Sequence, residues 1–148
     1  MKTLTTCVSV LALAACGGGS GGGAALTKVQ YDAKVNRLCL VSADRLRELH
    51  IDNTVADWKS HLGASAVAID KDFTDKLAAW TPPASIASAA AAYVKANAKV
   101  TQDERDAVAA ATAGDKAKLS AVLKQSNKDA LATYPSAKQL GAKDCYFP

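Results

Sequence analysis

A long stripe of apolar side chains at helical spacing constrains the fold of this chain more than any other feature of its sequence. The stripe consists of Val55, Trp58, Leu62, Ala66, Ile69, Phe73, Leu77 and Trp80, at intervals of three or four residues. Such intervals match the turn of an α-helix and lack the alternation of a strand. Thr81 is followed by two prolines, which cannot continue a helix. The spacing predicts one amphipathic helix over about Val55 to Trp80.

Three further segments share this spacing and lie between clear helix boundaries. They run from about Thr27 to Leu49, from Ala84 to Ala113 and from Asp115 to Leu140, the last kinked or interrupted at Pro135. Thr27 and Asp115 are typical N-cap residues, and Gly114 suits the left-handed position after a helix. Alanine, the strongest helix former, supplies 32 of the 148 residues. Four helices with short connections predict an all-α, up-down-up-down bundle over residues 26–148.

The segment before the predicted bundle has the features of a secretory signal peptide. Lys2 supplies a positive charge, and the run from Leu4 to Ala15 is mostly apolar and carries no charge. This run is too short to cross a bilayer as a stable helix, but its length is typical of a secretory signal. We therefore expect residues 1–15 to be a signal peptide that directs the chain out of the cytoplasm.

The end of this signal resembles the lipobox of bacterial lipoproteins. Leu13, Ala14 and Ala15 stand directly before Cys16, and Gly17 follows it. The resemblance implies that the chain is cut before Cys16 and that the Cys16 thiol receives a diacylglycerol, with palmitate as a typical acyl chain. Two or three acyl chains hold a protein stably at a membrane, here at the extracytoplasmic face. The alternative is an ordinary cleaved signal with an incidental cysteine. In the lipidated chain, residues 16–25, which are rich in glycine, would form a flexible tether between the membrane and the bundle.

The remaining cysteines predict a disulfide. Cys7 leaves with the signal and Cys16 is acylated, which leaves Cys39 and Cys145 in a compartment where disulfides persist. A Cys39–Cys145 bridge would tie the C-terminal tail to the first helix and place Tyr146 and Phe147 against the bundle. A reactive thiol or a metal-binding pair is the alternative, although neither cysteine has a neighbouring ligand at metal spacing.

Two short stretches also resemble small helical-bundle lipoproteins of actinobacteria. These proteins often carry a cysteine in the first helix and a closing Leu-Gly-x-x-Cys-like element. The corresponding stretches here are Asn36-Arg37-Leu38-Cys39 and Leu140-Gly141-Ala142-Lys143-Asp144-Cys145, the second being one residue longer. The resemblance implies a fold of this kind and no site residues.

Polar residues give little indication of chemistry. His50, Asp52, Asp57 and His61 lie near one predicted turn and could support a metal ion, but a solvated helix end is the favoured interpretation. The acidic groups Asp70, Asp72 and Asp75, and Asp103, Glu104 and Asp106, are interpreted as solvated helix faces. No serine elbow or phosphate loop occurs. A net charge of +4 with interspersed acidic residues excludes a strongly electrostatic nucleic-acid binder.

The aromatic side chains allow two interpretations. Trp58, Phe73, Trp80, Tyr31, Tyr93 and Tyr134 fit core packing, or a groove for an apolar ligand between alanine-rich helices. Asn97 and Glu104 fall near the seam of their helix, where a polar residue usually sets register. We therefore expect a membrane-anchored, non-catalytic binding module of the cell envelope, without cofactor, metal or nucleic acid. The alternative is a carrier of an apolar small molecule or lipid. A protein partner in the envelope is compatible with either.

Overall fold

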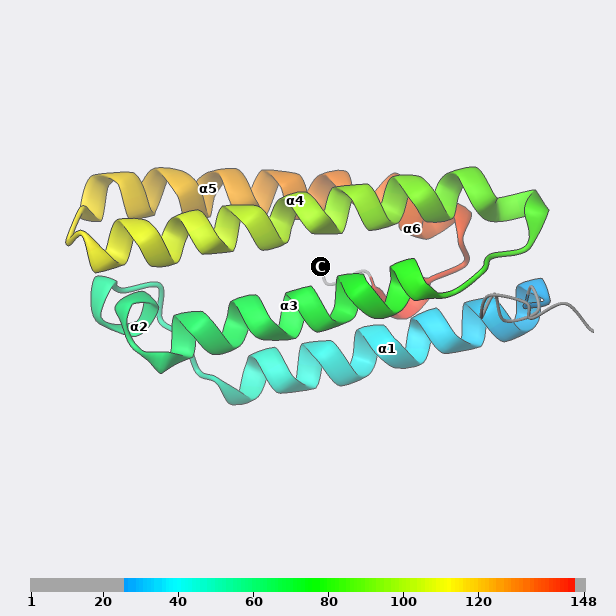
Figure 1. Cartoon of the computed structure of the whole chain (residues 1–148), viewed down its shortest axis with the longest axis horizontal. Coiled ribbons are helices and arrows are strands. Elements are labelled where there is room, and N and C mark those ends of the chain that lie inside the picture. The colour runs from blue at the N-terminus through cyan, green and yellow to red at the C-terminus, as the bar shows by residue number, and fades with distance from the viewer. Residues whose placement is uncertain (1–25, 146–148) are drawn as a thin grey trace, which may run out of the picture.

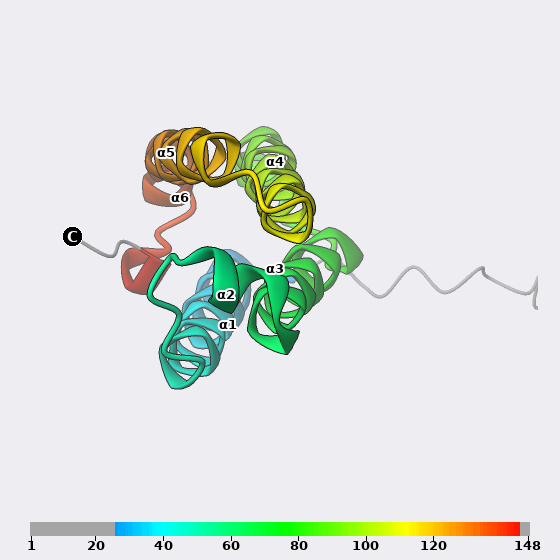
Figure 2. The same ribbon diagram turned by 90° about the vertical axis from the view of Figure 1, so that its left-hand side faces the viewer.

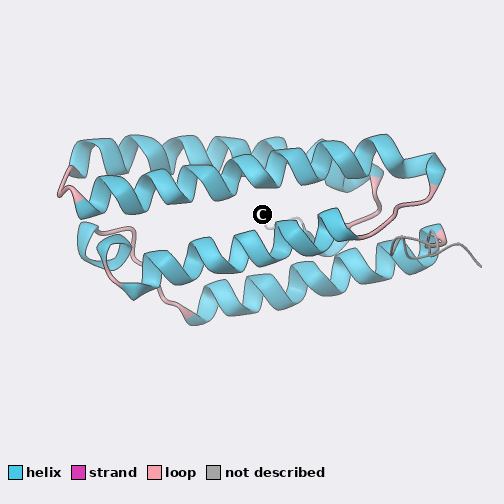
Figure 3. Ribbon diagram, in the orientation of Figure 1, coloured by secondary structure: helices cyan, strands magenta, loops and turns pink. Residues whose placement is uncertain are grey.

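The computed structural model describes residues 26–145, and this part of the chain is helical throughout, with short loops and no strand (Figure 3). The predicted all-α class is therefore confirmed for these residues. The predicted signal peptide, Cys16, the glycine-rich tether up to residue 25, and the Tyr146 and Phe147 contacts lie outside the described residues.

Long helices supply most of the fold, and short ones lie at its turns (Figure 1). The long helices are α1 (Lys28–Glu48), α3 (His61–Ala79), α4 (Ala87–Thr112) and α5 (Lys116–Ala132). The short elements are α2 (Val55–Lys59), α6 (Tyr134–Gln139) and the single 3-10 turns η1 (Ala84–Ile86) and η2 (Lys143–Cys145).

Side chains cap the helices at the predicted places. The Thr27 hydroxyl accepts a hydrogen bond from the backbone N–H of Gln30, and the Gln30 side chain accepts one from the Thr27 N–H, which forms a capping box. The Asp115 carboxylate accepts from the Lys118 N–H at 2.9 Å. Gly114, between α4 and α5, has φ +72°, a left-handed conformation that glycine adopts without strain. These three predictions are confirmed.

The prediction of one continuous helix from Val55 to Trp80 is wrong at Ser60. The backbone is extended there, and the Ser60 hydroxyl accepts from the Leu62 N–H at 3.1 Å, so that Ser60 ends α2 and caps α3. Gly63 allows the turn, since a Cβ at this position would collide with the Trp58 carbonyl. The apolar stripe survives because α2 still turns Trp58 into the interior.

Two other boundaries differ from the predicted ones. The third segment begins with the 3-10 turn η1, and α4 proper starts at Ala87. The fourth segment ends at Ala132, and a separate helix, α6, begins at Tyr134 with Pro135 in its first turn. Proline is tolerated there because a first-turn N–H has no partner within the helix.

The helices form two layers that lie nearly parallel along the long axis (Figure 1). In one layer α1 packs on α3, in the other α5 packs on α4, and α3 also packs on α4. The view along the axis places α6 and η2 between α5 and α1 (Figure 2). A simple up-down-up-down bundle would place the last long helix directly beside the first, whereas here η2 is the segment that packs on α1 at this side.

Two buried clusters hold the layers together. The larger contains Tyr31, Val35, Leu38, Phe73, Leu77, Tyr93 and Leu140 among its members. The smaller contains Trp58, Ala107, Ala110, Ala111 and Leu119 at the α2 end. The alanines of the smaller cluster are almost fully buried, and their small size lets the backbones of neighbouring helices approach closely.

The C-terminal tail folds back along α1, as predicted. A disulfide joins Cys39 of α1 to Cys145 of η2, with a Cα–Cα distance of 5.2 Å, which confirms the predicted bridge. Asn36 holds the tail as well: its side-chain amide donates to the Gly141 carbonyl at 3.2 Å, and its oxygen accepts from the Asp144 N–H at 2.8 Å. Gly141 reverses the chain with φ +71°.

Candidate functional site

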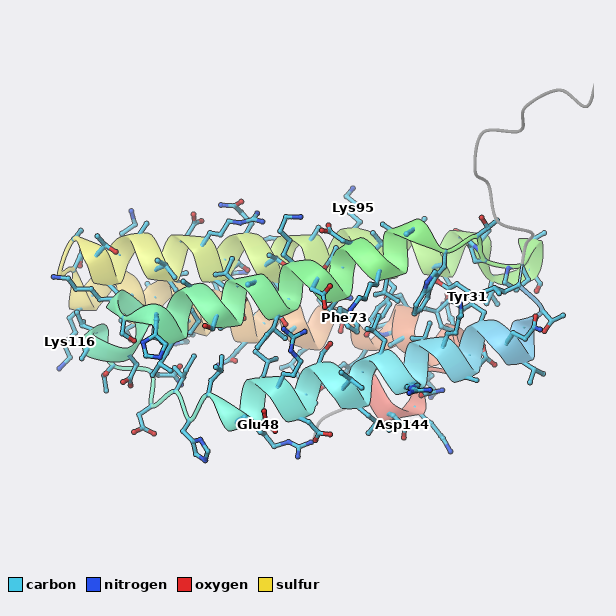
Figure 4. The ribbon with its side chains drawn as sticks, turned by 60° about the horizontal axis from the view of Figure 1, so that its bottom comes forward. Tyr31, Glu48, Phe73, Lys95, Lys116 and Asp144 are labelled. Carbon is cyan, nitrogen blue, oxygen red and sulfur yellow. A yellow bond between two sulfur atoms is a disulfide. The ribbon has the colours of Figure 1, made fainter. Side chains whose placement is uncertain are left out.

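A partly open groove with a volume of about 240 Å³ lies where α1, α3, α4, α5, α6 and η2 meet. Its wall is mostly apolar, from Ala43, Leu46, Phe73, Val100 and Ala130 together with the Cys39–Cys145 disulfide. Its polar side chains are Ser42, Asp70, Tyr93, Asn97, Thr133 and Tyr134. We call this site the disulfide groove. Phe73 points into the interior near the middle of the long axis, whereas Lys95 and Lys116 point outward (Figure 4).

The disulfide and two aromatic rings form a rigid part of the wall. Phe73 and Tyr93 meet edge to face with ring centroids 6.2 Å apart. The Tyr93 hydroxyl lies 3.8 Å from the Cys39 sulfur. Since Cys39 is fixed to Cys145, the η2 turn cannot leave this wall while the disulfide is intact.

Several polar groups of the groove are already bonded within their own helices. The Asn97 side chain donates to the Tyr93 carbonyl at 2.8 Å, and the Thr133 hydroxyl donates to the Ala130 carbonyl at 2.7 Å. These bonds hold the two side chains in place. They leave the Asp70 carboxyl as the charged side chain that faces the groove.

Asp70 of α3 is hydrogen-bonded to Glu104 of α4, which does not itself line the groove. Burial, followed by the charge and hydrogen bond of Asp70, raises the pKa of Glu104 to about 10. Burial also raises the pKa of Asp70, against the hydrogen bond from Glu104, which lowers it. Two adjacent carboxyl groups do not both ionise readily. At neutral pH, Glu104 therefore keeps its proton and donates a hydrogen bond to Asp70, so that Asp70 is the member of the pair that ionises first.

Neither Asp70 nor Glu104 forms an ion pair among residues 26–145. Lys71 pairs with Asp75, Arg45 and Lys76 pair with Asp72, and Lys99 pairs with Asp103 and Asp129. Arg105 acts on Glu104 through its charge, without an ion pair. Glu104 Oε2 is fully buried and accepts no hydrogen bond in the part of the chain that the structure describes. Asp70 is therefore an acidic side chain without an ion-pair partner in a mostly apolar wall.

The structure corrects the interpretation of the acidic segments as solvated faces. Asp103 is buried, Asp70 and Glu104 are half-buried, and these three side chains face neighbouring helices. Asp75 and Asp106 are exposed, as expected. Asp70 could have been detected, because Ala66, Asp70, Phe73 and Leu77 share one helical stripe.

The aromatic residues separate into groups. Phe73, Tyr93 and Tyr134 line the disulfide groove. Tyr31 and Trp80 meet edge to face at 6.3 Å, and Trp58 belongs to the smaller buried cluster. Phe73 and Tyr93 also belong to the larger buried cluster, so that core packing is confirmed for most of these residues and the ligand groove stays a prediction.

Three of the four residues considered as metal ligands have local structural contacts. Asp57 accepts hydrogen bonds from the Thr54 hydroxyl at 2.8 Å and from the Asp52 N–H at 3.1 Å at the start of α2, and a His50 ring nitrogen contacts the Glu48 carbonyl oxygen. Within residues 26–145, no cluster of three or more histidine, cysteine, aspartate or glutamate side chains has the geometry to hold a metal ion.

Comparison of the chain with protein families, curated proteins and solved structures found no match. Among the described residues, no helix has both the length and the apolar character needed to span a bilayer.

Proposed function

We propose that this chain is an extracytoplasmic lipoprotein that binds a small ligand in the disulfide groove and has no catalytic activity. The observation that carries the proposal is the groove itself: a mostly apolar hollow with fixed walls and one half-buried acidic side chain, Asp70. Ligand sites of proteins commonly combine apolar walls with a few fixed polar groups. This favours the carrier alternative over a module that only contacts another envelope protein.

The proposed anchor rests on the sequence before residue 26. The lipobox-like Leu13-Ala14-Ala15-Cys16 and the glycine-rich residues after it fit an acylated cysteine on a flexible tether. The bundle would then be held near the membrane surface and remain free to rotate. The Cys39–Cys145 disulfide supports an oxidising compartment.

We also interpret the architecture as an up-down-up-down bundle of the long helices α1, α3, α4 and α5. The short loops that join successive elements favour antiparallel neighbours. In this interpretation α2 and α6 are accessory turns, and η2 completes the side between α1 and α5.

Native mass spectrometry of protein extracted from the membrane of its own cells tests the proposal. We expect a mature chain that begins at an acylated Cys16, contains one disulfide and releases a bound small molecule on activation. A Cys16→Ala variant serves as the control and should lose the acyl mass and the membrane fraction. Recovery of an unacylated chain with its leader would refute the anchor, and an always empty groove would refute the binding function.

A further inference from the structure

We propose that the disulfide groove is built for a monocationic amphiphile, a molecule with an apolar body and a single ammonium group. The ammonium group would contact the Asp70 carboxylate, and the apolar body would lie against Phe73, the disulfide and the neighbouring aliphatic side chains. This inference rests on the proposed binding function and specifies its ligand class.

The size and composition of the wall determine the apolar part of the ligand. The groove, at about 240 Å³, is larger than the engineered cavity of about 150 Å³ that accommodates benzene. The side chains of Leu46, Phe73 and Val100 line this space with apolar atoms. The polar side chains of Asn97 and Thr133 are hydrogen-bonded to backbone carbonyls of their own segments. Burial of an alkyl or aryl body here is therefore favoured by the hydrophobic effect.

The carboxyl pair determines the charge of the ligand. Of the two acidic side chains, Asp70 lines the groove and ionises first, so that Asp70 supplies the negative charge there. An ionised Asp70 would repel an anionic ligand, and a neutral ligand would leave its charge without a cationic partner. An ammonium group forms a charge-assisted hydrogen bond with the carboxylate.

Aromatic rings strengthen the preference for an organic cation over a metal ion. Phe73, Tyr93 and Tyr134 line the same groove, and aromatic faces attract ammonium groups. Calcium, in contrast, takes six or more oxygen ligands, far more than one carboxylate on an apolar wall provides. The charge and the apolar surface therefore point to the same molecule.

Isothermal titration calorimetry with three matched probes tests this inference on the intact, disulfide-bonded protein. Octylammonium, octanol and octanoate share one alkyl chain and differ in the charge of the head group. We expect octylammonium to bind about tenfold or more tightly than octanol at neutral pH, the size of one charge-assisted hydrogen bond, and octanoate to bind weakest.

Variants then assign the preference to the carboxyl pair. Glu104→Gln keeps a hydrogen-bond donor next to Asp70 and should retain the preference for octylammonium. The double variant Asp70→Asn/Glu104→Gln removes the charge and should lose the preference, while its binding of octanol shows that the groove is still folded. Asp75→Asn, which removes an exposed charge from the same helix, is the matched control and should behave as the unmodified protein.

The outcomes separate the two proposals. Equal binding of octylammonium and octanol, or tightest binding of octanoate, would overturn the inferred charge of the ligand and leave the groove as a binding site. A preference for octylammonium that persists in the double variant would also overturn it, because another group would then hold the cation. Failure of all three probes to bind would overturn both the ligand class and the proposed binding function.

Discussion

Replacement of Glu104 by glutamine should stabilise this protein, and the gain should increase with pH. A carboxyl group whose pKa is higher in the folded than in the unfolded chain contributes stability fully below the unfolded pKa, and this contribution is lost as the pH rises through the folded pKa. The ordinary pKa of a glutamate is 4.5, and burial beside Asp70 raises that of Glu104 to about 10. Across this window, ionisation in the unfolded chain favours unfolding.

The size of the expected gain follows from the difference between the working pH and the ordinary pKa of a glutamate. Above pH 4.5, ionisation of Glu104 in the unfolded chain should lower the free energy of unfolding of the unmodified protein by at most about 1.4 kcal/mol per pH unit. At pH 7 the accumulated loss is at most about 3 kcal/mol. Glutamine has nearly the same shape, does not ionise and can still donate to Asp70. We therefore expect a gain of about 1–3 kcal/mol at pH 7 and almost none near pH 4.5.

Urea unfolding monitored by circular dichroism at several pH values between about 4.5 and 9 measures this difference. Asp70, Asp103 and Arg105 also act on Glu104, but they are present in both proteins and largely cancel in the comparison. Glu48→Gln, at an exposed position near the end of α1, is the control and should leave the pH profile unchanged. Parallel profiles for the unmodified protein and Glu104→Gln would refute the buried, protonated state of Glu104.

Three further variants test the fold. Cys39→Ser with Cys145→Ser should lower the free energy of unfolding by up to about 4–5 kcal/mol, because the bridge spans a sequence separation of 106; an unchanged urea midpoint would contradict this. Gly63→Ala should cost about 2 kcal/mol or more, since the methyl group meets the Trp58 carbonyl, and a melting temperature equal to that of the unmodified protein would contradict it. Asn36→Ala should cost about 1–3 kcal/mol and speed amide exchange in η2; unchanged exchange there would show that Asn36 does not hold the tail.

Helix positions were predictable because caps and breakers are local. Thr27, Asp115 and Gly114 define boundaries through their own side chains or backbone, without reference to the rest of the fold. The break at Ser60 was not predicted because the interval from Trp58 to Leu62 still equals one helical turn. Periodicity measures which residues face inward, and α2 and α3 face the same interior although their axes differ.

The carboxyl pair of the candidate site was missed for a different reason. Asp70 lies next to Lys71 and Asp72, and Glu104 lies between Asp103 and Arg105, so that each has charged neighbours like those of a solvated face. Their proximity depends on the register of α3 against α4, which no local pattern specifies. The disulfide, in contrast, followed from counting cysteines in an oxidising compartment, and the structure contains it.

The position of Cys145 affects the order in which this molecule is completed. The helices pair largely with sequence neighbours, α3 with α4 and α4 with α5, and such local contacts form early during folding. Closure between Cys39 and Cys145 spans most of the described chain and carries a larger entropic cost. Oxidation of the two thiols is therefore favoured after the helices have assembled around them. Because the same two sulfurs form part of the groove wall, formation of this disulfide completes both the groove and the folded chain.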